Sequence, residues 1–386
     1  MSANPTVSLS RRSQIAPFLA MDVMEQARMV AESGRDVVHM EVGQPGTPAP
    51  KAAAERVAAA MRSGDPMGYT VALGRPDLRA GIADLYRKRH GVEIDPARVV
   101  ITSGSSCGFI LAFLSLFDAG ARVALADPGY PAYRNILGAL DLEVARIETH
   151  LDTGFQPTPA HLEQAGDLAG LLVASPANPT GTMLSREALR DLIDYCGDRG
   201  ITFISDEIYH GLTYGAPAVS ALEFSDNAII INSFAKYFSM TGWRVGWMIV
   251  PESMIRTIEA LAQNLFICAP HVSQVAALGA LEAEAELEAH KAVYAANRER
   301  LLGALPGMGF TDIAPADGAF YVYANLTQLS NDSRNFCSKL LQEGGVAATP
   351  GLDFDPVRGH GTLRFSFART EAEIAEGIER IGRFLS

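Results

Sequence analysis

Short apolar runs alternate with helix-like segments along most of the chain from about residue 98 onward. The runs are rich in Val and Ile and lack a regular apolar–polar alternation, which is typical of strands buried on both faces of a parallel sheet. Six runs share this pattern, at residues 98–102, 122–126, 170–174, 201–205, 228–232 and 245–250. The pattern predicts an α/β fold in which helices flank a mostly parallel sheet.

The segment between the third and fourth runs has the spacing of an amphipathic helix. Its apolar positions recur at i, i+3, i+4 and i+7, at Leu189, Leu192, Ile193 and Cys196. Ser185 can cap the start of this helix and Gly200 its end. The two runs and the helix therefore predict a βαβ unit. An Ala-rich segment at residues 49–64 is also expected to be helical.

After Pro251 the pattern changes from alternating runs to longer helical stretches. A helix is expected near residues 252–263. The Ala- and Glu-rich stretch from residue 271 to about 305 contains strong helix formers, and it predicts one helix long enough to join two domains.

The C-terminal tail reads as a smaller α+β region. Strands are expected at residues 319–324 and 362–368 with a helix near 336–341 between them, and Thr370 with Glu373 forms a capping box that opens a last helix. We therefore expect two domains. Their ranges are 47–285 for the large domain and 286–386, with the N-terminal segment 1–46, for the small one.

Composition narrows the class of protein. With 48% hydrophobic and 20% charged residues, the 386-residue chain is expected to fold. Its net charge of −12 argues against nucleic-acid binding, because neutralising phosphates requires clustered Lys and Arg. The four cysteines and eight histidines show no disulfide or metal-ligand spacing, so no metal site is expected. The chain lacks a membrane-length apolar window and a signal-peptide core, which predicts a cytoplasmic protein without a membrane partner.

Polar clusters follow five of the predicted strands. In an open parallel sheet, ligands bind beyond the carboxyl ends of the strands, so these clusters are expected to converge on one edge. In chain order, they read "SGSSCG", "DPGYPAY", "SPANPTG", "DEIYHG" and "SFAK".

The first cluster, with Gly104, Ser105 and Ser106, leads into an apolar helix. Free backbone N–H groups at a helix start form an anion site, although an ordinary capped turn would have the same sequence. The same cluster contains "GSSCG", which matches the nucleophile elbow of a serine hydrolase. That remote alternative would use Ser106, Asp206 and either His271 or His360.

The later clusters supply an amine, a carboxylate and a guanidinium. Lys236 could simply face solvent, but a lysine held in an apolar pocket is available as a neutral nucleophile. Asp206 ends an apolar strand and either caps a turn or forms a partly buried partner for a cation. Arg244 stands between Trp243 and Val245 and is expected to be buried, which requires an anion. Together these groups suit a phosphorylated aldehyde with a basic ring nitrogen, which is pyridoxal 5'-phosphate.

At this point the sequence resembles the class I/II aminotransferases, aspartate-aminotransferase-like transferases of the fold type I pyridoxal-phosphate family. The resemblance implies a large domain that binds the cofactor and a reaction that moves an amino group between an α-amino acid and a 2-oxo acid. It extends over nearly the whole chain through the motifs "EVGQP", "YTVALGRPDLR", "DPGYPAY", "NPTG", "SDEIY", "SFAKYFSMTGWRVGW" and "LRFSFA".

The resemblance also implies roles for single residues. Lys236 would carry the cofactor as a Schiff base and move the substrate's α-proton. Asp206 would pair with the pyridine nitrogen, Tyr209 and Asn178 would hydrogen-bond the phenolic oxygen, and Tyr130 would stack on the ring.

The phosphate and substrate roles follow from the same resemblance. The phosphate would bind at Gly104, Ser105, Ser106, Ser233 and Arg244. Tyr69 would reach it from a neighbouring subunit, which implies a homodimer with shared sites. The substrate α-carboxylate would bind at Arg364, beside Gly43 and Asn178.

Two positions depart from the family pattern. The motif "GxPDF" reads "GQPGTP" here, and a small hydroxyl residue is replaced by Ala235. These departures lie near the substrate entrance and the phosphate. The sequence therefore does not identify the side chain of the substrate. A β-lyase or decarboxylase-type reaction on the same fold is the alternative to transamination.

Overall fold

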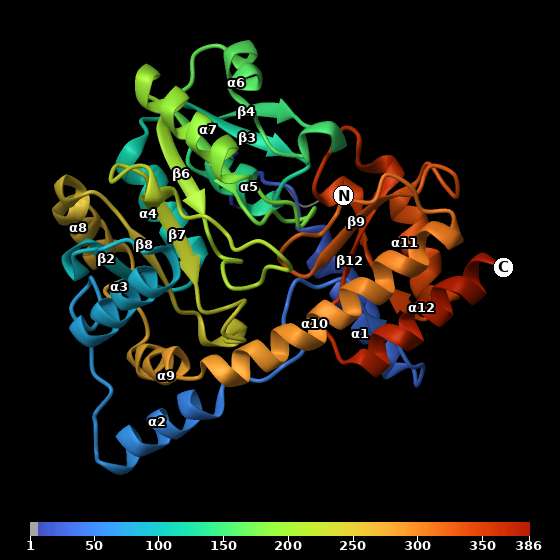
Figure 1. Cartoon of the computed structure of the whole chain (residues 1–386), viewed down its shortest axis with the longest axis horizontal. Coiled ribbons are helices and arrows are strands. Elements are labelled where there is room, and N and C mark those ends of the chain that lie inside the picture. Colours follow the sequence, from blue (N-terminus) through green and yellow to red (C-terminus); the bar gives the residue numbers. More distant parts are fainter. Residues whose placement is uncertain (1–6) are drawn as a thin grey trace.

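The computed structural model describes residues 7–386, so residues 1–6 of the N-terminal segment lie outside it. A seven-stranded sheet forms the centre of the larger part (Figure 1), with the strand order β2-β8-β7-β6-β5-β3-β4. The strands are β2 (Val99–Thr102), β3 (Arg122–Asp127), β4 (Glu143–Glu148), β5 (Gly170–Ala174), β6 (Thr202–Asp206), β7 (Ile229–Ser233) and β8 (Gly246–Ile249).

The sheet is mostly parallel, as predicted. Strands β4, β3, β5, β6 and β7 run parallel, whereas β8 runs antiparallel to both β2 and β7. The expectation that residues 245–250 form a parallel strand is therefore wrong. A strand that is buried on both faces has the same apolar pattern whether it runs parallel or antiparallel to its neighbours. The edge strand β4 was missed, since its residues alternate between buried and exposed.

Helices cover both faces of this sheet. Two apolar clusters pack against this sheet. In β7, Ile229 and Ile231 belong to one cluster and Ile230 belongs to the other, so successive side chains are buried on opposite faces. This burial on both faces is why the predicted runs lack polar positions. The helices of this part are α2 (Lys51–Arg62), α3 (Pro76–His90), α4 (Ser105–Leu116), α5 (Pro131–Ala139), α6 (Pro159–Ala165), α7 (Arg186–Arg199) and α8 (Ile255–Leu265). The predicted caps of α7 are confirmed: Ser185 accepts a hydrogen bond from the Ala188 N–H, and Gly200 is left-handed.

The smaller part contains two short sheets. Strands β9 (Tyr321–Asn325), β12 (Thr362–Ser366) and β11 (Thr349–Pro350) pair antiparallel, and β1 (Val38–His39) pairs parallel with β10 (Val346–Ala347). The N-terminal segment thus contacts the C-terminal region through β1. The helices here are α1 (Leu19–Glu32), α11 (Ser333–Gln342) and α12 (Glu371–Leu385), and α12 begins with the predicted capping box.

The long helix expected from residue 271 is two helices. Helix α9 (His271–Leu281) ends beside α2, and α10 (Glu284–Ala304) then crosses to α12 (Figure 1). The expectation of one helix was wrong because neither Pro nor Gly marks the break at residues 282–283, so local propensity predicts no interruption. Packing against different partners separates the two helices. Among the described helices, none has both the length and the apolar character needed to span a membrane.

Candidate active site

A cavity of about 210 Å³ lies at the carboxyl ends of the central strands. Side chains from all five polar clusters line it, as the strand order requires. The predicted site residues that line it are Gly43, Ser105, Ser106, Tyr130, Asn178, Asp206, Tyr209, Lys236, Arg244 and Arg364. A larger cavity of about 430 Å³ beside Arg358 contains none of these residues, so its size does not make it the site.

Lys236 follows β7 and projects its amine into the cavity. The amine donates a hydrogen bond of 2.5 Å to the Gly43 carbonyl. Burial, together with the nearby Arg364 and Arg244 guanidinium groups, lowers the pKa of Lys236 to about 8, although the Asp206 carboxylate acts in the opposite direction. The surface-lysine alternative is therefore wrong. A useful fraction of this amine is neutral, and thus nucleophilic, near neutral pH.

Asp206 is the last residue of β6, and only 3% of it is exposed. Burial raises the pKa of its carboxyl to about 6, although hydrogen bonds from the Tyr133 hydroxyl and the Ile208 N–H act in the opposite direction. A buried carboxylate of this kind is stabilised by a cationic partner in the cavity. Sequence reasoning missed Tyr133, which lies on α5 only three residues after Tyr130.

Tyr209 and Tyr321 join the two parts of the chain across the cavity. Their hydroxyl oxygens lie 2.7 Å apart, and their rings are nearly perpendicular. A Cβ atom at Gly43 would lie 2.0 Å from the Tyr321 hydroxyl oxygen, so only glycine fits there. Tyr321 was also missed, because in "AFYVYA" it reads as an ordinary strand residue.

Helix α4 begins at Ser105 without a side-chain capping bond, so its first N–H groups are available to an anion. Its N-cap, Gly104, has a φ of +78°, and a Cβ atom there would lie 2.4 Å from Arg244 Nη2. The Arg244 guanidinium therefore covers the helix start. Arg244 itself is exposed, and the expectation of a buried guanidinium is wrong because Trp243 beside it is only half-buried.

Arg364 is one of the most deeply buried charged residues, with 1% exposed. Its guanidinium donates to Asn178 Oδ1 at 2.8 Å and to the Glu41 carbonyl at 2.5 Å. Its Nε–H is buried and has no hydrogen-bond partner in the structure. An unpaired donor of a buried guanidinium beside a cavity fits a carboxylate ligand.

Three predicted site residues do not line the cavity. Gly104 lies behind the Arg244 guanidinium. The Ser233 hydroxyl donates to the carbonyl of Val245, just before β8, and accepts from the Ala235 N–H, so both of its hydrogen bonds go to backbone groups. Tyr69 is 83% exposed on the surface of this chain.

The serine-hydrolase alternative fails on geometry. Of the described residues that line the cavity around Ser106, none is a histidine. His271 is instead bound to Arg75 and to the Gly68 carbonyl. Without a histidine beside Ser106 in this cavity, the "GSSCG" motif is the start of α4 and not a nucleophile elbow.

The residues present fit pyridoxal 5'-phosphate. The amine of Lys236 suits its aldehyde, the carboxylate of Asp206 its ring nitrogen, and the uncapped start of α4 its phosphate. The helix-flanked sheet with this site at its carboxyl edge defines a fold type I pyridoxal-phosphate-dependent transferase.

Comparisons with known proteins give the family. The profile "Aminotransferase class I and II" matches residues 35–381. Valine–pyruvate aminotransferase of Mycobacterium tuberculosis is 48% identical over 98% of this chain and 99% of its own. A crystal structure of an aminotransferase from Mycobacterium tuberculosis has a TM-score of 0.96 and 48% identity over 98% of this chain and 99% of its own.

Aspartate aminotransferase from Thermus thermophilus, solved with maleate, has a TM-score of 0.92 at 29% identity over 98% of this chain and 100% of its own. The chain belongs to the class I and II aminotransferases. It moves an amino group between an α-amino acid and a 2-oxo acid, with pyridoxal phosphate as cofactor. The β-lyase and decarboxylase alternative has no support among these relatives.

Proposed function

We propose that this aminotransferase uses aliphatic α-amino acids such as valine as donors, with a small 2-oxo acid such as pyruvate as acceptor. The observation that carries this proposal is the charge distribution of the cavity. Among the described lining residues, the cations are Lys236, Arg244 and Arg364. Each already has an assigned partner, so an acidic substrate side chain would lie unpaired.

The apolar part of the cavity wall supports the same substrate class. Apolar side chains reach it from the start of α1 and from the segments that carry Gly43 and Asp206, and they are Phe18, Ala20, Met21, Val42 and Ile208. Burying an aliphatic side chain against such a wall stabilises binding by about 0.8 kcal/mol per CH₂ group. The relative named valine–pyruvate aminotransferase, 48% identical, agrees with this assignment.

We assign the following roles to the lining residues. Lys236 is the catalytic residue: its neutral amine accepts the proton from the substrate α-carbon and returns it on the way to the product. Arg364 holds the substrate α-carboxylate and so orients the amino group. Asp206 keeps a proton on the cofactor's ring nitrogen. When bound, pyridoxal phosphate supplies the electron sink for this proton transfer.

The remaining residues position the two small molecules. The Tyr209 hydroxyl and the Asn178 amide hydrogen-bond the ring oxygen, and Tyr130 lies against the ring. The phosphate group binds to the start of α4 at Ser105 and Ser106, with Arg244 above it; Gly104 leaves room for that guanidinium. The Ser233 hydroxyl holds the turn before Lys236 through its hydrogen bonds to the backbone of Val245 and Ala235, and its contact with the phosphate stays a prediction.

The test is a comparison of amino donors with purified holoenzyme and pyruvate as acceptor. We expect kcat/KM for valine to exceed that for aspartate by at least about tenfold, because an unpaired carboxylate is costly to desolvate. Met21→Arg should raise the aspartate rate relative to valine by adding a cation to the wall. Met29→Arg is the control, because Met29 is exposed on the same helix as Met21 but does not line the cavity. Equal or faster turnover of aspartate by the wild type would refute the substrate class.

We also propose a cytoplasmic homodimer in which Tyr69 reaches the phosphate site of the partner. The exposure of Tyr69 supports this, as does the neighbouring exposed Val71. All four cysteines are free thiols, which fits a reducing compartment.

A further inference from the structure

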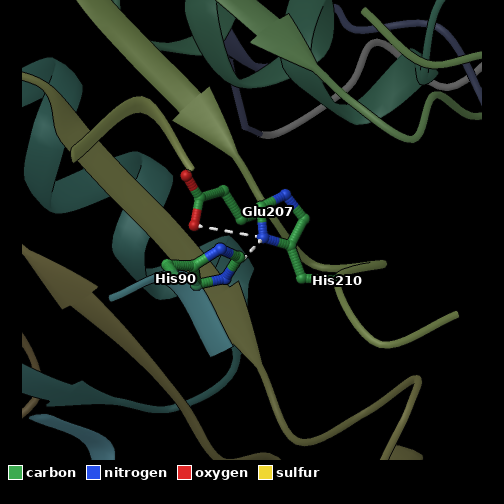
Figure 2. Close-up of side chains that lie close together, drawn as sticks. All are labelled: His90, Glu207 and His210. Atoms are coloured by element: carbon green, nitrogen blue, oxygen red, sulfur yellow. Dashed lines mark hydrogen bonds and ion pairs between the residues drawn. The ribbon is translucent and has the colours of Figure 1, made fainter. Parts of the chain in front are cut away.

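A second cluster of polar side chains lies outside the cavity. His90 is the last residue of α3, whereas Glu207 and His210 belong to the turn that follows β6 (Figure 2). Their side chains are 6%, 0% and 3% exposed, respectively. Buried imidazoles and carboxylates need partners, and the active site uses none of these three.

The distances within this cluster match those of a metal centre. His210 Nδ1 lies 3.4 Å from His90 Nε2 and 3.4 Å from Glu207 Oε2, and all three atoms lie within 4.8 Å of one another (Figure 2). Two ligand atoms 3.4 Å apart, each about 2.1 Å from a zinc ion, subtend about 108° at the metal. That angle is tetrahedral. A direct hydrogen bond between the same atoms would be shorter than 3.4 Å by several tenths of an ångström.

Hydrogen bonds on the far side of His210 and Glu207 orient His210 Nδ1 and Glu207 Oε2 toward the space between the three side chains. His210 Nε2 lies 3.0 Å from the Ser175 carbonyl oxygen, to which it must donate, so the lone pair is on Nδ1. Glu207 Oε1 accepts from the Ser220 hydroxyl at 2.8 Å and from the Ala221 N–H at 3.0 Å. These bonds fix the carboxylate and leave Oε2 to the Tyr86 hydroxyl and the cluster. Such outer partners are typical of metal-bound imidazole and carboxylate groups.

His90 provides the independent observation. Its Nδ1 is buried without a hydrogen-bond partner, yet it lies 3.4 Å from Glu223 Oε1. If the single proton of a neutral His90 is on Nδ1 and faces Glu223, three lone pairs converge between His90, His210 and Glu207. A metal cation would satisfy all three lone pairs.

We propose that His90 Nε2, His210 Nδ1 and Glu207 Oε2 bind one divalent transition-metal ion of the zinc class. Two imidazoles and one carboxylate are a ligand set that zinc favours, and Glu223 and the Ser175 carbonyl complete the outer shell. The ion joins the end of α3 to the turn that starts at Asp206 and contains Tyr209. Sequence reasoning expected no metal because His90 lies far from the other two ligands along the chain.

The first test measures metal content on the intact holoenzyme. Protein produced in zinc-supplemented medium and dialysed against metal-free buffer is analysed by mass spectrometry for bound metals. We expect about one zinc ion per chain in the wild type, and at least about a tenfold loss in His90→Gln and in His210→Gln. His150→Gln is the matched control, since His150 also lies beside a glutamate but is exposed. Its zinc content should equal that of the wild type.

A second pair of variants tests the outer shell without removing a ligand. Glu223→Gln should weaken zinc binding by about 10- to 100-fold. Glu223 also pairs with Arg186, so Arg186→Gln removes that ion pair and the contact of Arg186 with the Phe224 ring, and it should leave zinc binding unchanged.

If a ligand variant fails to fold, the wild type still decides the question. Cobalt added as the probe, with water as its fourth ligand, should give the intense visible absorption of a four-coordinate ion, and zinc should displace it. Wild-type protein that holds no zinc and shows no such cobalt spectrum would overturn the proposal, as would folded His90→Gln with full zinc content. These readouts are independent of the amino donor, so their outcome is separate from that of the proposed function.

Discussion

The chemistry of Lys236 depends on where its amine lies. An exposed lysine keeps nearly all of its amine protonated at neutral pH, whereas burial lowers the pKa of Lys236 to about 8. At pH 7 about one amine in ten is then neutral, several hundred times more than in a free lysine. The site gains this nucleophile without a neighbouring base.

This shift predicts the pH dependence of cofactor capture. In apoenzyme, the rate at which Lys236 reacts with added pyridoxal phosphate should rise about tenfold per pH unit below pH 8 and level off above it, because only the neutral amine attacks. Stopped-flow absorbance from pH 6 to 9.5 measures this rate. A rate that still rises about tenfold per pH unit up to pH 9.5, as for a lysine with the ordinary pKa of 10.5, would show that burial does not control the amine.

Arg364 gives the second prediction at this scale. A guanidinium grips a carboxylate through two parallel hydrogen bonds, a geometry that lysine cannot copy. Arg364→Lys should therefore lower kcat/KM for valine by about 10- to 150-fold, which corresponds to roughly 1.5 to 3 kcal/mol. The comparison substrate is 2-methylpropylamine, the same amine without its carboxylate. If the variant loses equal activity toward both, Arg364 does not hold the carboxylate.

At the residue scale, the order of the strands in the central sheet explains which site residues could be predicted from the sequence. Lys236, Asp206 and Asn178 each follow a recognisable apolar run, so their meeting point follows from the sheet alone. Tyr133 ends the cluster "DPGYPAY", but nothing in that motif marks it as the partner of Asp206, and Tyr321 follows no such cluster. Each reaches the cavity through tertiary contacts with Asp206 or Tyr209, which no local pattern records.

At the scale of elements, the packing of the helices decides where α9 ends and α10 begins. Helices α2 and α9 cross closely because Gly279 has no side chain: a Cβ atom there would lie 2.3 Å from the Ala52 carbonyl oxygen. The same packing explains the break after α9, since this helix is held against α2 while α10 follows α12. Local patterns predicted α7 with both caps, whereas the break depends on contacts distant in sequence.

Gly279→Ala should destabilise the protein by about 1 to 3 kcal/mol, because the two helices must separate to admit the methyl group. Gly303→Ala is the matched control. Gly303 lies in α10 with no atom near its would-be Cβ, and alanine is favoured there by about 1 kcal/mol as a helix former. Differential scanning calorimetry should show a lower melting temperature for the first variant and an equal or higher one for the second. Equal shifts in both would mean that the crossing is not tightly packed.

On the scale of the whole molecule, the site belongs to both parts of the chain. Lys236 follows the large sheet, whereas Arg364 lies on β12 of the smaller one, and α10 spans between the parts (Figure 1). The boundary after residue 285 stays a prediction; it lies two residues into the helix that begins at Glu284. Relative movement of the two parts would change the separation of the amine and the guanidinium.

A further part of the site is expected from a second copy of the chain. The segment that carries Tyr69 is held beside α9, because His271 hydrogen-bonds to the Gly68 carbonyl and Gln274 to Thr70. Exposed apolar side chains occur along both stretches and just before α9, at Tyr69, Val71, Leu265, Ile267 and Val272. Such a surface is typical of a subunit interface.

Mixed dimers test whether sites are shared. Lys236→Ala lacks the amine, and Tyr69→Ala lacks the hydroxyl that would reach the partner's phosphate site, so each variant alone should be nearly inactive. In a mixed dimer, one of the two sites regains both native residues. Random reassortment should therefore restore about one quarter of the wild-type activity, measured as valine–pyruvate turnover after dissociation and remixing. Mixed dimers verified by native mass spectrometry that remain inactive, with both variants folded, would show that Tyr69 does not complete the partner's site.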